Sequence, residues 1–152
     1  MKNKNSNNLF YISLPENWAD QTCHTFTGPE IENFRHNLIV TCEKKNDKTH
    51  DLTSLARTRI EHLRQNLQGI EILKSEEKKL LSSGRTAFEV VYKYTPDGGG
   101  TIYQKQVFVL EDKKLFTFTA SFLKETLQTI GAQVDEIIDS FRPHSNRLVE
   151  KF

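Results

Sequence analysis

The chain has 152 residues and a formal net charge of +1, from 21 Lys and Arg against 20 Asp and Glu. Because basic and acidic residues balance and are interspersed, neither nucleic-acid binding nor attraction to an anionic membrane surface is expected. A chain of this length buries a sizeable core without a disulfide or a structural metal, and is most simply one domain.

The expected organisation is a single domain over residues 9–143, preceded by a disordered N-terminus at 1–8 and followed by a flexible tail at 144–152. The polar start has no apolar signal core, and no window approaches the roughly 18 apolar residues that span a bilayer, so a cytoplasmic protein is expected. In that compartment Cys23 and Cys42 are expected to be free thiols.

Three extended segments precede the first predicted helix. Alternating side chains favour strands at Leu9–Leu14, Ala19–Thr27 and Asn37–Glu43. The turn-forming pair Gly28 and Pro29 is expected to close the second of these strands.

Two amphipathic helices are predicted. The first runs from Leu52 to Leu67 with an apolar stripe at helical spacing, and the Asp51 carboxylate is placed to cap its free N–H groups. The second begins near Lys124, keeps its apolar spacing as far as Phe141 and is followed by Pro143.

The remaining segments are predicted strands. Ile70–Leu81 suits a strand or a short helix, and its position between a helix and a turn favours the strand. Arg85–Tyr94 alternates clearly, and the glycine-rich turn at 96–100 leads into Thr101–Phe122, a β-hairpin that we expect at the centre of a sheet. The predicted fold class is α+β: an antiparallel sheet with both helices packed on one face.

Catalytic and metal-binding patterns are absent from the sequence. The five histidines never form a close pair with ligand spacing, and Cys23 and His24 are strand neighbours whose side chains point to opposite faces. Gly98, Gly99 and Gly100 lack the Lys and Ser/Thr of a phosphate loop. We therefore expect neither an enzyme nor a cofactor.

Binding is the better-supported class of function. If both helices cover one sheet face, the other is solvated, covered by a second copy, or used as a site. Its expected members mix amide, hydroxyl, thiol and apolar groups with hardly a charge: Cys23, Thr25, Val40, Gln104, Gln106, Phe108, Thr117 and Thr119. An ordinary protected or dimer surface remains the alternative.

Several segments together resemble the DcrB-like family, and within it the effector-associated chaperones of bacterial type VI secretion. The resemblance covers about Leu9 to Pro143. Its most specific motifs are an LP-x-x-W-x-D-Q-T start and a K-Q-V-F hairpin strand, carried by Leu14, Pro15, Trp18, Asp20, Gln21 and Thr22 and by Lys105, Gln106, Val107 and Phe108.

This resemblance implies a PsbP-like fold, a homodimer, and a sheet surface that shields the N-terminal transmembrane helices of a secreted effector before export. It places the binding residues at Cys23, Thr25, Arg59 and Gln106. Family members often have larger aliphatic residues at the first two positions and are expected to have a neutral amide at the third. The alternative is a DcrB-type stress or envelope-linked protein that binds a small hydrophobic ligand.

Overall fold

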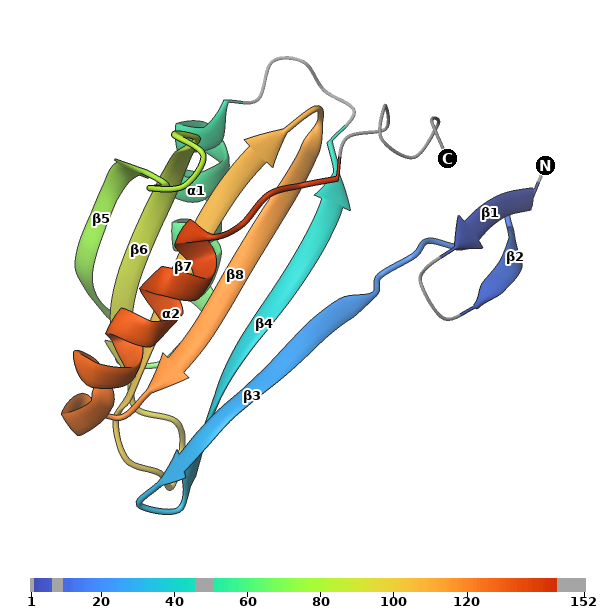
Figure 1. Cartoon of the computed structure of the whole chain (residues 1–152). Helices are drawn as coiled ribbons and strands as arrows, with labels where there is room; N and C mark the ends of the chain where they lie inside the picture. Colours follow the sequence, from blue (N-terminus) through green and yellow to red (C-terminus); the bar gives the residue numbers. More distant parts are fainter. Residues whose placement is uncertain (1, 7–9, 46–50, 145–152) are drawn as a thin grey trace.

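The computed structural model describes residues 2–6, 10–45 and 51–144. A six-stranded antiparallel sheet forms the body, in the order β3-β4-β8-β7-β6-β5 (Figure 1). Its strands are β3 (Cys23–Ile31), β4 (Phe34–Lys44), β5 (Glu71–Lys79), β6 (Thr86–Tyr94), β7 (Ile102–Glu111) and β8 (Lys114–Phe122). The helices are α1 (Leu52–Asn66), the 3-10 turn η1 (Lys124–Thr126) and α2 (Thr129–Asp139).

The β7-β8 hairpin lies at the centre of the sheet, as the sequence predicted. Its two turn residues, Asp112 and Lys113, have positive φ of 47° and 63°, the left-handed conformation of a two-residue hairpin turn. The apolar side of β8 packs with alternate residues of β7 and with α2 in one buried cluster that contains Val107, Val109, Phe118, Ala120, Phe122, Ile130, Val134 and Ile138.

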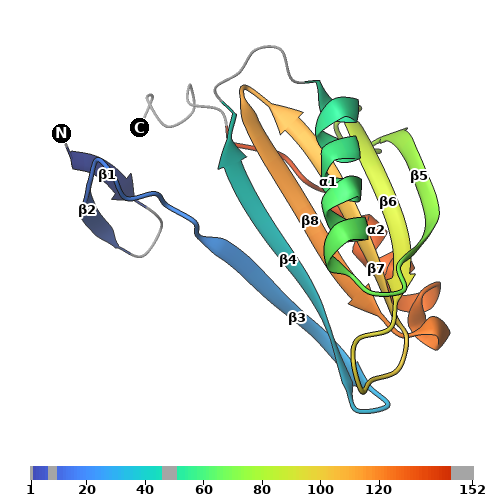
Figure 2. The same ribbon diagram turned by 180° about the vertical axis from the view of Figure 1, so that it is seen from behind.

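The two helices cover opposite faces of the sheet, so the α+β class is confirmed but the placement of both helices on one face is wrong. Helix α2 closes the cluster around Phe122, whereas α1 packs on the other face over Phe88, Tyr92 and Phe108 (Figure 2). The physical reason lies in β6, which is buried on both sides along most of its length. A strand with two apolar faces needs a layer on each.

Strands β3 and β4 form a long two-stranded wing at one edge. The expected stop at Gly28 and Pro29 does not end β3, because the register shift between Thr27 and Glu30 absorbs both residues as a bulge on an edge strand. Pairing then resumes as far as a two-residue turn at Glu32 and Asn33, whose φ values are also positive.

The N-terminal segment is a separate two-stranded sheet of β1 (Lys2–Ser6) and β2 (Tyr11–Pro15). Strand β1 lies within the segment predicted to be disordered, and β2, the first predicted strand, pairs with β1 rather than with the main sheet. The predicted tail is described only at His144, and 145–152 lie outside the described residues.

The other predicted elements are present, with several changes of boundary: the second predicted strand begins at Cys23 rather than Ala19, and the third begins at Phe34 rather than Asn37. Residues 71–79 form a strand, Asp51 Oδ1 accepts from Ser54 N at 2.7 Å at the start of α1, and both cysteines are free thiols. The last helix begins later than predicted, since η1 occupies Lys124–Thr126 and α2 starts at Thr129. No helix of the described residues is long and apolar enough to cross a membrane.

Candidate binding face

The residues singled out in the sequence fall into rows that cross four strands on the α1 side of the sheet. Gln106 is opposite Thr119, Thr119 is opposite Ile39, and Ile39 is opposite Thr25. The next row runs from Phe108 through Thr117 and Thr41 to Cys23. Gln104, Ser121, Asn37 and Thr27 form a third row, and none of the three rows contains a charged residue.

Helix α1 leaves most of these rows uncovered. It packs against β6 and β7, and the sheet surface of β8, β4 and β3 lies open beside it (Figure 2). We call this surface the open face, and define it as the α1-side residues of β3, β4 and β8 in these rows together with Gln106: Cys23, Thr25, Thr27, Asn37, Ile39, Thr41, Gln106, Thr117, Thr119 and Ser121.

Two polar atoms at the border between α1 and the open face have no hydrogen-bond partner among the described residues. They are Gln106 Oε1 and Thr117 Oγ1, on side chains that are only 7% and 5% exposed. An unpaired buried polar group costs about 1–3 kcal/mol, so such groups are uncommon in a closed surface. The two side chains are diagonal neighbours on β7 and β8, because Gln106 is opposite Thr119 and Thr117 is opposite Phe108.

A charged cluster bounds one end of the open face. Glu43, which follows the Thr41 row on β4, accepts from Arg59 of α1 at 3.4 Å and from Lys45 at 3.1 Å. A cavity of about 240 Å³ lies beside it at the edge of α1, with Arg59, His62 and Leu115 among its lining residues. Both ion pairs are partly exposed, so each contributes little to folding.

Four of the predicted site residues lie outside the open face: Arg59 on α1, at the charged end, and three residues of the sheet. Val40 lies on the α2 side, opposite Phe118, and packs against the core there. Phe108 shares the α1 side but is 1% exposed beneath that helix. Gln104 is already satisfied, because its amide accepts from Tyr92 Oη at 2.6 Å and donates to Ser121 Oγ at 2.9 Å.

Burial keeps the Tyr92 phenol in its neutral, donating form. Desolvation raises the pKa of Tyr92 far above its usual value of 10.0. The hydrogen bond from Tyr92 to Gln104 therefore persists across the physiological pH range, and it fixes Gln104 in the third row. The unpaired atoms belong to the other two rows, Gln106 Oε1 to the first and Thr117 Oγ1 to the second.

Sequence reasoning missed Ile39 and Thr41, which lie between the predicted residues of β3 and those of β8. Their alternation was visible, but the face that they share depends on pairing register. The signal that would have found them is the antiparallel pairing of β4 with both neighbours, since one aligned pair assigns every second residue to a face.

The opposite face carries a buried ion network rather than unpaired atoms. Glu89 accepts from Lys74 at 3.0 Å and from Lys78 at 2.8 Å, and Lys105 is 2.7 Å from Asp135 of α2. Burial alone would raise the pKa of Glu89, but the bonds from Lys78 and Lys74 outweigh it and hold that pKa below its usual value. This network ties β5, β6 and β7 to α2.

Among the described residues, no three His, Cys, Asp or Glu side chains lie close enough together to hold a metal ion.

A family model named DcrB matches residues 11–140, which include the whole six-stranded sheet and both helices. The chain belongs to the DcrB family. The earlier resemblance is thereby confirmed at the level of the family, and the type VI subgroup stays a prediction. No curated protein matches the sequence.

Solved structures similar to this DcrB-family protein share its fold at low sequence identity. A Pseudomonas aeruginosa protein of unknown function, PA94, has a TM-score of 0.77 at 14% identity, over 95% of this chain and 99% of that one. Cyanobacterial PsbP (CyanoP) from Synechocystis sp. PCC 6803 has a TM-score of 0.57 at 16% identity, over 94% and 92%. The predicted PsbP-like fold is therefore confirmed.

A third similar structure is LpqN of Mycobacterium tuberculosis, described as involved in cell envelope biogenesis. Its TM-score is 0.51 at 20% identity, over 73% of this chain and 64% of that one. At such identities the likeness concerns the fold alone.

Proposed function

We propose that this DcrB-family protein is a non-enzymatic chaperone that holds an apolar α-helix on its open face. The observation that carries the proposal is the uncharged open face beside α1, with two buried polar atoms at its border, Gln106 Oε1 and Thr117 Oγ1, that have no partner among the described residues. The client with matching chemistry is a membrane-destined helix that contains a Ser or Thr hydroxyl or another small polar group, because such groups hydrogen-bond between packed helices.

The dimensions of the open face support a helix as the occupant. Neighbouring strands lie about 4.8 Å apart, so the strip from β7 to β3 is about 14 Å wide, slightly more than the ~10–12 Å diameter of a helix. The three rows occupy β4 from Asn37 to Thr41. At about 3.3 Å per residue this is ~16 Å, so the open face would hold about half of a 20-residue apolar helix, which is ~30 Å long.

The energetic reason for such a chaperone is the apolar area of the client. A transmembrane helix in water exposes surface whose burial is worth roughly 25 cal/mol per Å². Ile39 and the methyl groups of the threonine rows offer apolar contact, and the hydroxyls offer hydrogen bonds to polar groups of the client.

The family resemblance supports a specific client, the N-terminal transmembrane helices of a type VI secretion effector, held in the cytoplasm before export.

A homodimer is part of the proposal, since β3 is an edge strand whose side chains are mostly exposed, Phe26 at 57% among them. Unpaired strand edges and exposed aromatic residues favour association with another chain.

The test is co-expression with the protein encoded by the neighbouring gene, in full and without its N-terminal apolar segment. We expect only the full-length partner to copurify. Gln106→Ala should weaken the complex more than Lys113→Ala, which alters an exposed turn residue away from the open face. Copurification of neither form, or equal binding by the two variants, would overturn the proposal.

The two free cysteines give a positional readout for the same complex. Cys23 lies on the open face and Cys42 on the α2 side of β4. A bound client helix should slow alkylation of Cys23 by iodoacetamide and leave that of Cys42 unchanged. The reverse pattern would place the client on the other face and contradict the site.

A further inference from the structure

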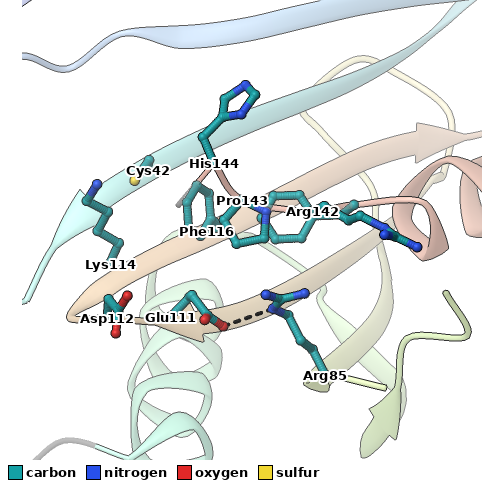
Figure 3. A pocket seen from close by; sticks show the side chains of 10 residues that line it. Cys42, Arg85, Glu111, Asp112, Lys114, Phe116, Arg142, Pro143 and His144 are labelled. Atoms are coloured by element: carbon teal, nitrogen blue, oxygen red, sulfur yellow. Dashed lines mark hydrogen bonds and ion pairs between the residues drawn. The ribbon is translucent and has the colours of Figure 1, made fainter. Parts of the chain in front are cut away.

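A second cavity lies on the α2 side of the sheet, away from the open face. Its volume is about 420 Å³, within the ~300–1,000 Å³ typical of small-molecule sites. Phe116 of β8 and Cys42 of β4 form its floor, and the segment that follows α2, including Phe141 and Arg142, crosses the sheet as its wall (Figure 3).

The walls of this cavity are anchored by contacts of their own. The Phe141 ring packs against Phe116 and Phe118, with centroids 4.9 and 5.1 Å apart, and its backbone N–H donates to Ile138 O at 3.0 Å. Next to it, Arg85 Nε donates to Glu111 at 2.9 Å. The site is therefore formed before a ligand arrives, which lowers the entropic cost of binding.

The charges around the cavity leave an excess of positive groups. Arg85 and Glu111 neutralise each other. Lys114 also lines the cavity and makes no ion pair among the described residues, against a single further carboxylate, Asp112. Arg142 lies at the other end of the cavity (Figure 3), where its Nη2 donates to Ser82 O at 3.4 Å. An aromatic floor next to an unpaired cation matches a molecule with an apolar body and one anionic end.

We infer that this cavity binds a small amphipathic carboxylate. Its apolar part lies on Phe116 and Phe141, and its carboxylate reaches Lys114 at one end of the rim. This site is separate from the proposed helix-binding function, because it occupies the other face of the sheet and shares no residue with the open face.

Thiol protection tests the site with an internal control. Sodium octanoate, below its micelle-forming concentration, should slow alkylation of Cys42 and leave that of Cys23 unchanged, as followed by mass spectrometry of the two peptides. Octylamine, with the same chain and the opposite charge, should protect neither cysteine. Absence of Cys42 protection, equal protection of both cysteines, or equal protection by octylamine would each overturn the inference.

Charge-removing variants sharpen the test. Lys114→Gln should weaken octanoate binding about tenfold, the effect of losing one charged hydrogen bond. Lys113→Gln, on the same turn but outside the cavity, should leave the affinity for octanoate unchanged. Because Lys114 itself lowers the pKa of the Cys42 thiol, which burial raises, protection is compared with and without octanoate within each variant. Equal affinity in the two variants would contradict the carboxylate contact.

Discussion

The two sides of the β7-β8 hairpin are built from the same strands yet differ in chemistry. Toward α2 the alternate residues are Val107, Val109, Phe118, Ala120 and Phe122, closed by α2 in one apolar cluster. Toward α1 the buried apolar residues, Phe108 and Leu115, lie beneath that helix, and the other side chains are mostly polar: Gln104, Gln106, Thr117, Thr119 and Ser121. The first side is closed by a helix along the hairpin, and the second includes the surface for which we propose a partner.

The largest effect is expected on the closed side. Phe122 is 0% exposed. Phe122→Ala should lower the free energy of unfolding by about 3–5 kcal/mol, through lost burial and a residual cavity. Thr119→Ala, on the other side of the same strand, should cost less than about 1 kcal/mol. Urea unfolding of both variants measures the contrast, and equal losses would remove the distinction between the two sides.

The ion network on the α2 side should give the next largest effect. Glu89→Gln leaves Lys74 and Lys78 without their buried anion, and should lower the free energy of unfolding by roughly 2–3 kcal/mol at neutral pH. Glu30→Gln alters an exposed ion pair and is the matched control. It should change the free energy of unfolding by less than about 1 kcal/mol.

This network also predicts an acid dependence with a definite sign. Because the pKa of Glu89 in the folded state lies below its usual 4.5, its contribution is full above 4.5 and is lost as the pH falls through the folded value. The stability gap between the wild type and Glu89→Gln should therefore narrow below pH 4.5 in unfolding curves taken across that range. A gap that stays constant would show that the Glu89 charge does not stabilise the fold.

On the α1 side, removal of an unpaired hydroxyl should stabilise the free protein. Thr117→Val keeps the side-chain shape and eliminates a buried oxygen without a partner, so the free energy of unfolding should rise by about 0.5–1.5 kcal/mol. Client binding should weaken at the same time. Thr119→Val, at a less buried site, is the control. A stability loss in Thr117→Val would mean that its hydroxyl is already satisfied.

The smallest effect is expected at the charged end of the open face. Arg59 and Glu43 form a partly exposed pair, so Arg59→Gln should change the free energy of unfolding by less than about 0.5 kcal/mol. With the cation replaced by the neutral amide expected in the family, binding of a wholly apolar helix should strengthen. Weaker binding of that helix, measured by copurification, would assign Arg59 a direct attractive role.

Local sequence patterns determined the elements and the chemical division within each strand. Alternation along 115–122 separated the apolar side of β8 from its half-polar side, and Asp51 marked the start of α1. Strand alternation and helix capping depend on residues close together in the sequence, so the sequence specifies them directly.

Only the tertiary structure decided which side each helix covers, and therefore what remains open. The segment from β4 to β5 must cross the sheet, because those strands are separated by β8, β7 and β6, and local periodicity carries no information about the side on which it crosses. Pairing register likewise moved Val40 to the α2 side and brought Ile39 and Thr41 onto the open face. The alternation of side chains along a strand specifies which residues share a face. Only long-range packing decides whether a helix covers that face or leaves it exposed.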